Sequence, residues 1–125
     1  MTNLKTKFIA LTYFLGPKYK KSYSQQGEDI IIAKLLKIIG IKNPFYIDIG
    51  ANHPIDLSNT YLFYKRGGQG ILVEPDHKLC KKIRSKRHRD ICIEAGIGTE
   101  RGKKKFYEFQ DDDLGTFSEE NAVVH

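Results

Sequence analysis

An acidic residue and a glycine turn follow one another at the end of a short apolar run, and this pattern is suited to ligand binding. Residues 45–49 are mostly aromatic or β-branched, which predicts a buried strand. Asp48 stands near the end of this strand, and Gly50, Ala51 and Asn52 form the turn that follows. In open α/β sheets, ligands bind beyond the carboxyl ends of the strands, where glycine lets them approach the backbone. The alternative is an ordinary buried strand that ends in a turn.

The residue types in this turn indicate which ligand to expect. A dinucleotide-binding loop needs three glycines, and only Gly50 is present; a phosphate-binding loop ending in Gly-Lys-Ser/Thr is also absent. Asp48 would repel a phosphate but would suit a ligand with a cationic end. S-adenosylmethionine is such a ligand, because it carries an ammonium group, a sulfonium group and a ribose diol.

A second apolar run, 70–74, also ends in an acid, Glu74. In nucleotide-binding α/β folds, the acid that ends the second strand, about 20 residues beyond the glycine turn, accepts hydrogen bonds from the ribose hydroxyls. Glu74 follows Gly50 at about this spacing. The alternative is that Glu74 only caps the following helix.

The remaining elements predict an α/β fold with about three parallel strands, flanking helices and a strand in a C-terminal hairpin. Ser22 or Ser24 can cap the first helix, whose wide apolar face needs a sheet to cover it. The third helix is basic and is expected to present a solvated outer face. The expected helices are 22–40, 59–66 and 77–89, and the expected strands are 45–49, 70–74, 91–95 and 103–109.

The composition is that of one soluble globular domain: 125 residues, of which 40% are hydrophobic and 29% charged. The net charge of +6 comes without any nucleic-acid motif, so we expect no nucleic-acid partner. Cys80 and Cys92 lack metal-ligand spacing, and we expect reduced thiols in a cytoplasmic protein and no metal site, with a disulfide as the alternative. The acidic residues 111–113 are expected to form a solvated loop.

The first 21 residues form a separate basic and apolar segment. It contains five lysines and no acid, and its apolar stretch, 8–15, is too short to cross a bilayer, which takes about 20 residues. We expect a short helix that packs on the domain, or a weak contact with an anionic membrane surface.

Several motifs, in order, resemble the FkbM family of S-adenosylmethionine-dependent methyltransferases. The likeness runs from about Ser22 to Asn121. The matching stretches are 22–29 (Ser-Tyr-Ser-Gln-Gln-Gly-Glu-Asp), 46–54 (Tyr-Ile-Asp-Ile-Gly-Ala-Asn-His-Pro), 58–60 (Ser-Asn-Thr), 63–67 (Phe-Tyr-Lys-Arg-Gly) and 70–75 (Gly-Ile-Leu-Val-Glu-Pro). One departure is Gly68, where the family usually has Trp, and we expect looser packing there.

The resemblance implies a Rossmann-like methyltransferase fold and assigns roles to individual residues. Asp48 and the Gly50 turn would line the methionine and ribose side of the cofactor, and Glu74 would hold the ribose hydroxyls. Gln25 would lie near the cleft, although it could equally be a plain helix-start residue. The implied cofactor-binding residues are Gln25, Asp48, Gly50, Ala51, Asn52, Glu74 and Pro75.

The implied reaction is O-methylation of a hydroxyl on a sugar or another small metabolite, and the catalytic base is unknown, with His53 and Asp56 as nearby candidates. The family domain is longer than this chain, so residues 22–125 are expected to be an incomplete domain. The alternative function is therefore a truncated, non-catalytic fragment that binds cofactor or pairs with another chain. An unpaired edge on the first strand would favour such self-association.

Overall fold

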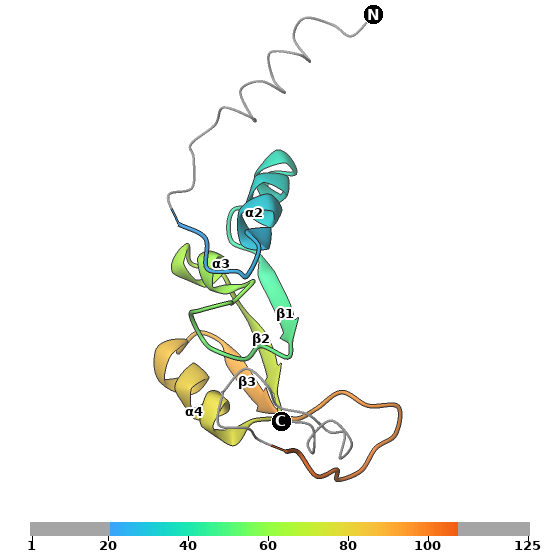
Figure 1. Ribbon diagram of the computed structural model, residues 1–125. Helices are drawn as coiled ribbons and strands as arrows, with labels where there is room; N and C mark the ends of the chain where they lie inside the picture. Colours follow the sequence, from blue (N-terminus) through green and yellow to red (C-terminus); the bar gives the residue numbers. More distant parts are fainter. Residues whose placement is uncertain (1–20, 108–125) are drawn as a thin grey trace, which may run out of the picture.

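The computed structural model describes residues 21–107, which form one parallel sheet with helices packed on it (Figure 1). The helices and strands alternate along the chain, as an α/β fold requires. In chain order they are α2 (Glu28–Ile38), β1 (Phe45–Ile49), α3 (Tyr61–Lys65), β2 (Gln69–Glu74), α4 (His77–Lys86) and β3 (Ile91–Glu94).

The sheet has three strands in the order β1-β2-β3, and both pairs are parallel. Ile47 of β1 lies opposite Ile71 of β2, which in turn lies opposite Ile91 of β3. The parallel α/β architecture predicted from the sequence is therefore confirmed. The three carboxyl ends meet at one edge of the sheet, which is the edge where such folds bind ligands.

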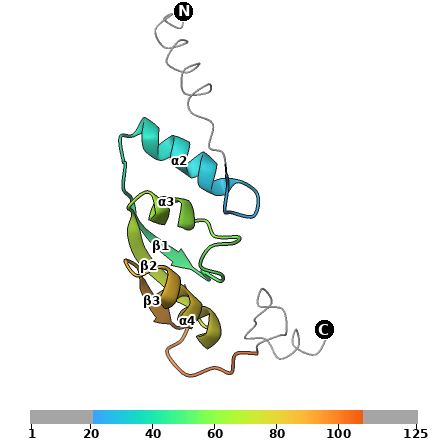
Figure 2. The same cartoon turned by 90° about the vertical axis from the view of Figure 1, so that its left-hand side faces the viewer.

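One face of the sheet is covered by α3 and α4, which lie on the same side in Figures 1 and 2. The core there forms two clusters, one around Leu62 and Phe63 of α3 and the other around Leu72 of β2 and Ile83 of α4. Tyr46 packs against both clusters and so joins them. Leu62, Phe63 and Ile83 are buried on the inward faces of these two helices.

The opposite face of the sheet is open within residues 21–107. Phe45, Ile47 and Ile49 of β1 are between 61% and 64% exposed, and Ile91 and Ile93 of β3 are also exposed. In the described part of the chain β1 pairs with β2 alone, so its outer edge is free there. Self-association through this edge stays a prediction.

Helix α2 packs mainly on α3 rather than on the sheet, which differs from the expected arrangement. Only Asp29 and Ala33 of this helix are buried, and most of the apolar side chains that were expected to cover a sheet are exposed, although the half-buried Leu36 packs against the α3 cluster. In Figure 2, α2 lies beyond α3, on the side away from β2 and β3, and the connecting residues 39–44 lead from its end to the start of β1.

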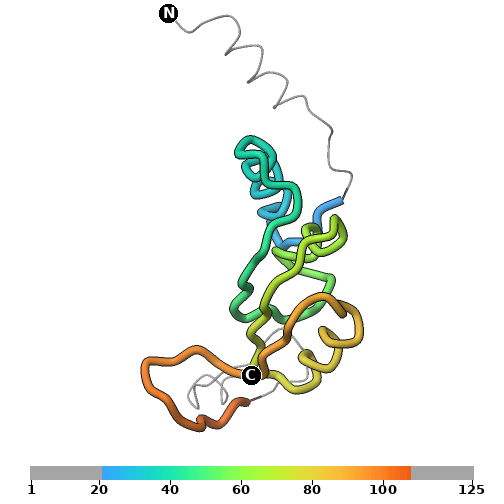
Figure 3. Tube along the Cα trace, turned by 180° about the vertical axis from the view of Figure 1, so that it is seen from behind, coloured from blue at the N-terminus to red at the C-terminus, as the bar shows by residue number. Residues whose placement is uncertain are grey.

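The chain beyond β3 leaves the sheet as an open loop, shown in orange in Figure 3. The expected strand over 103–109 is wrong for residues 103–106, which are irregular, and Tyr107 makes only an isolated bridge. Residues 108 and 109, the acidic loop at 111–113 and the segment 1–20 lie outside the described residues. Within residues 21–107, no helix combines the length and the apolar character needed to cross a membrane.

Candidate functional site

The turn after β1 has the open backbone that a ligand site needs. The N–H groups of Gly50 and Ala51 both donate to the carbonyl oxygen of Val73 in β2, at 2.8 and 3.2 Å. Gly50 has φ +70°, in the left-handed region that favours glycine, and a Cβ added there would meet no atom within 4 Å. The turn is thus fixed to the sheet on one side and open on the other, which fits the approach of a cofactor to the backbone.

Glu74 joins the ends of the two neighbouring strands. Its side chain is buried, and one carboxylate oxygen accepts a hydrogen bond from the Asn52 N–H at 2.8 Å. The other oxygen accepts from the Asp76 N–H at 2.9 Å. Because an ionised carboxylate can accept about four hydrogen bonds, Glu74 keeps acceptor capacity for hydroxyl groups.

The helix after β2 is capped by Asp76 and not by Glu74. The Asp76 carboxylate accepts from the N–H groups of Lys78 and Leu79, at 2.6 and 3.0 Å, at the start of α4. Because Asp76 caps the helix, the Glu74 carboxylate is left to accept from the Asn52 N–H in the turn that contains Gly50. The capping alternative for Glu74 is therefore wrong, and the ribose-binding role that the resemblance implied stays a prediction.

Asp48 is half-buried on the covered face of β1, and it too is held by a neighbouring segment. One of its oxygens accepts a hydrogen bond of 2.7 Å from the hydroxyl of Thr60, the residue just before α3. A cavity of about 370 Å³ lies beside β1, and both Asp48 and Thr60 line it. The predicted acid is therefore fixed at the sheet edge next to a hollow.

A buried polar network lies behind Asp48, and the sequence reasoning missed it. Its centre is Arg87, which follows α4 and is fully buried, although it was expected on a solvated face. The Arg87 guanidinium pairs with the buried carboxylate of Asp90 at 2.7 Å. It also donates to the hydroxyls of Tyr46, Thr60 and Ser58, at 3.1, 3.0 and 3.3 Å. Burial raises the pKa of Tyr46 well above its usual range, although the adjacent guanidinium opposes the shift.

Two sequence signals could have pointed to this network. Asp90 is the lone acid at the end of a basic run, three residues after Arg87, where the two can form an ion pair. The Ser58-Asn59-Thr60 stretch contributes two of its hydroxyls.

Gln25 lies in the loop before α2 and is exposed. This loop is held by Asp29, whose carboxylate accepts from the hydroxyls of Ser22 and Ser24, at 2.7 and 2.9 Å. Gly27 is the N-cap residue by position, so the predicted serine cap is displaced, but the Ser24 hydroxyl does accept from the Asp29 N–H in the first turn of α2, at 3.2 Å. Figure 2 shows the loop, in blue, on the side of the molecule toward which β1 points. No described contact joins Gln25 to the other candidates, so its role stays a prediction.

The ends of β2 and β3 are also connected. The Ala95 N–H donates to the carbonyl oxygen of Glu74 at 3.2 Å, and the half-buried Pro75 lies between Glu74 and the cap Asp76. Cys80 is buried beneath, with its thiol 3.1 Å from the same carbonyl oxygen. Burial raises the pKa of Cys80 to about 12, so its thiol stays protonated. Cys80 and Cys92 are both free thiols.

The geometry of His53 argues against a role as general base. Its Nδ1 accepts from the N–H groups of Ile55 and Asp56, at 3.3 and 3.0 Å. A neutral imidazole with Nδ1 as the acceptor carries its proton on Nε2, which then cannot take another. Asp56 is largely exposed, with its carboxylate 3.5 Å from the same Nδ1.

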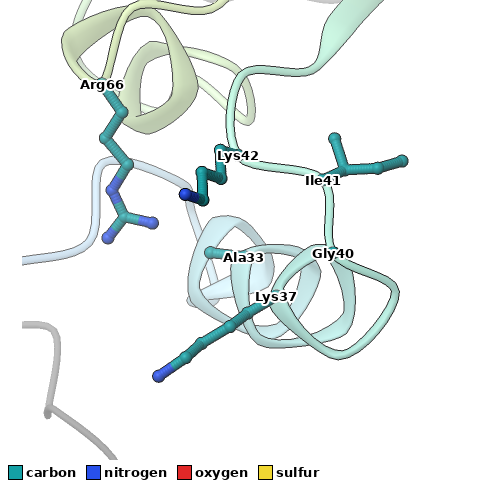
Figure 4. Close-up of a pocket in the computed structure, with 6 residues that line it drawn as sticks. All are labelled: Ala33, Lys37, Gly40, Ile41, Lys42 and Arg66. Carbon is teal, nitrogen blue, oxygen red and sulfur yellow. The ribbon is translucent and has the colours of Figure 1, made fainter.

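A second hollow, of about 260 Å³, lies at the other end of β1 and has a basic lining (Figure 4). Lys37, Lys42 and Arg66 line it together with Ala33, Gly40 and Ile41. None of the predicted cofactor residues lies in this hollow. It is therefore separate from the site at the carboxyl ends of the strands.

Gly68 is buried and closely packed, so the expected looser packing at this position is wrong. A Cβ on Gly68 would lie 2.9 Å from the carbonyl oxygen of Phe63 and 3.0 Å from that of Pro44. Glycine lets these backbone segments approach each other at the entry to β2.

Comparison with known protein families gives one finding for this site. Residues 48–124 match the model of the methyltransferase FkbM domain, and the matched region begins at Asp48 and includes the Gly50 turn, Glu74 and Arg87. No curated protein and no solved structure gives a significant match.

Proposed function

The chain belongs to the methyltransferase FkbM family, since that family's model matches more than half of it, and we propose that it binds S-adenosylmethionine at the carboxyl ends of β1 and β2. The observation that carries this proposal is the pairing of two fixed acids, Asp48 and Glu74, around the open turn at Gly50. Family membership indicates the class of reaction, and the turn indicates where the cofactor would lie.

Each residue of the site has a chemical part in this proposal. Glu74 would accept hydrogen bonds from the ribose hydroxyls with the acceptor capacity that Asn52 and Asp76 leave. Asp48 would face the cationic methionine end, and the backbone at Gly50 and Ala51 would lie against the cofactor. When bound, S-adenosylmethionine supplies a methyl group that an oxygen nucleophile can accept.

The residues Gln25 and Pro75 complete the proposed set of contacts. Gln25 is exposed and could donate from its amide to a carboxylate, while Pro75 borders Glu74. We further propose that the acceptor is a hydroxyl of a sugar or another small metabolite and that the protein works in the cytoplasm, where its two free thiols would stay reduced.

Binding without catalysis is a second candidate, and one observation favours it. Within residues 21–107, the candidate base His53 uses Nδ1 to accept two backbone N–H groups, so this nitrogen is not free to take a proton from an acceptor hydroxyl. A methyl-transfer assay with a panel of sugars and hydroxylated metabolites separates the candidates. Transfer to any acceptor supports the enzyme, and cofactor binding without transfer supports the second candidate.

Calorimetric titration of the 125-residue chain with S-adenosylhomocysteine tests the proposed site itself. Asp48→Ala removes the acid at the turn, and Asp56→Ala is the matched control because it removes an exposed acid from the loop that follows. We expect binding by the unaltered chain and the control, and a loss of at least about ten-fold in Asp48→Ala, since a hydrogen bond to a charged group contributes about 1.5–3 kcal/mol. Equal affinities in all three proteins would contradict the proposal.

A further inference from the structure

The hydroxyl of Thr60 lies between a guanidinium that can only donate and a carboxylate that can accept. Nη2 of Arg87 is 3.0 Å from the Thr60 oxygen, and that oxygen is 2.7 Å from Oδ2 of Asp48. Arginine has no acceptor, so Thr60 must accept from it. The single hydroxyl proton of Thr60 is therefore directed to Asp48.

The Arg87 guanidinium cannot turn away from Thr60, because its other donors are also occupied. It is fully buried, pairs with Asp90 at 2.7 Å and donates to Tyr46 at 3.1 Å. Asp90 in turn accepts from the hydroxyl of Tyr46 and from the N–H of Gly70. A buried ion pair with this many partners holds one geometry, so the direction of the Thr60 hydroxyl is held as well.

Helix capping does not account for the Thr60 side chain. Thr60 is the N-cap residue of α3, yet its side chain makes no capping hydrogen bond. The hydroxyl of Ser58 accepts from the N–H groups of Thr60 and Tyr61 instead, at 3.4 and 3.1 Å. The Thr60 hydroxyl is thus available for the link between Arg87 and Asp48.

The charges of this group also favour a cationic ligand. Arg87 and Asp90 balance each other in a fully buried pair, and the half-buried Asp48 adds one further negative charge. Thr60 occupies Oδ2 of Asp48, whose other oxygen has acceptor capacity left. A positively charged group at this oxygen would neutralise the cluster.

We propose that Thr60 and Arg87 are positioning residues of the cofactor site, which hold the carboxylate of Asp48 in the orientation that receives the cationic end of the ligand. This inference rests on the proposed function for its ligand, but the orientation itself can be measured without any ligand. Neither residue touches the cofactor in this account. Each acts through Asp48.

Thr60→Val tests the inference, because valine has nearly the shape of threonine and no hydroxyl, and Thr60→Ser is the matched control that keeps the hydroxyl. Affinity for S-adenosylhomocysteine is measured by calorimetry on the full chain. We expect Thr60→Val to weaken binding by about three- to ten-fold, the cost of ordering one side chain, and Thr60→Ser to stay within about two-fold of the unaltered chain. Equal affinities in Thr60→Val and the unaltered chain would overturn the inference.

The orientation of Asp48 is measured in the ligand-free protein from its Hα–Hβ coupling constants by NMR. We expect one side-chain rotamer in the unaltered chain and in Thr60→Ser, and averaged couplings in Thr60→Val. A single Asp48 rotamer in Thr60→Val would overturn the inference. If Thr60→Val does not fold, Thr60→Ala replaces it in both measurements.

The two measurements separate a failure of this inference from a failure of the proposed function. If the unaltered chain does not bind S-adenosylhomocysteine, the proposed function fails, and the Asp48 couplings alone decide whether Thr60 positions the carboxylate. If the unaltered chain binds and the valine variant shows either the same affinity or a single Asp48 rotamer, the positioning role fails and the proposed function stands.

Discussion

Replacing Arg87 with methionine should destabilise the protein strongly, because Arg87 is fully buried and its charge balances that of the buried Asp90. Methionine fills much of the same space but leaves Asp90 with only its neutral donors, Tyr46 and the N–H of Gly70. Removing one partner of a buried ion pair typically costs about 3–5 kcal/mol. That is a large part of the roughly 5–15 kcal/mol by which a typical domain is stable.

Urea unfolding followed by circular dichroism measures this loss. With a denaturant slope of about 1–3 kcal/mol/M, we expect the midpoint to fall by roughly 1–5 M, or the variant to be unfolded without urea. Lys86→Met is the matched control, since Lys86 is the exposed last residue of α4 and its replacement should change the free energy of unfolding by less than about 0.5 kcal/mol.

The double variant Arg87→Met/Asp90→Asn separates the charge from the lost packing. Neutralising Asp90 removes the uncompensated charge, so the double variant should be more stable than Arg87→Met alone, by about 0.5–3 kcal/mol. Unfolding of Arg87→Met at the same urea concentration as Lys86→Met would contradict a stabilising role for this ion pair. A double variant whose loss of unfolding free energy equals the sum of the losses in Arg87→Met and in Asp90→Asn would also contradict it.

Two further predictions concern stability. Burial raises the pKa of Asp29, but hydrogen bonds from the Tyr23 N–H, two serine hydroxyls and the Ile30 N–H outweigh it and lower this pKa below its usual 3.8, so the free energy of unfolding should fall as the pH drops from about 4 through the folded pKa. Asp29→Asn should lower the free energy of unfolding by about 1–3 kcal/mol at pH 7 and should remove much of that acid dependence. Urea midpoints that change with pH identically in both proteins would contradict this prediction. Gly70→Ala should cost about 1–3 kcal/mol because the added Cβ would overlap the ring and carbonyl oxygen of Tyr46, whereas Gly102→Ala, with open space around it, should be nearly neutral in thermal unfolding.

The strands and the turn could be predicted because local residue types determine them. The β-branched and aromatic run at 45–49 and the glycine after it are read directly from the sequence, and the acid at the end of the second run needed only its spacing from Gly50. The structure places these residues at neighbouring strand ends, joined through the Asn52 N–H and Glu74. Local pattern and fold agree there.

The network around Arg87 could not be predicted in the same way, because its partners come from separate parts of the chain. Tyr46 lies in β1, Thr60 before α3 and Asp90 before β3, and only the folded sheet brings them together. In the sequence, Arg87 is one of several cations in a basic run, and composition alone favours an exposed position. The start of α2 was predicted only in part: Ser24 accepts from a first-turn N–H, but the hydroxyls of Ser22 and Ser24 also donate to Asp29 inside the helix.

Binding of S-adenosylhomocysteine tests the central claim most directly, through calorimetric titration of the unaltered chain, Asp48→Ala and Asp56→Ala side by side. We expect saturable binding by the unaltered chain and by Asp56→Ala, and affinity lowered by at least about ten-fold in Asp48→Ala. A folded chain that binds no S-adenosylhomocysteine, or an Asp48→Ala variant that binds it as tightly as the unaltered chain, would contradict the proposed cofactor site.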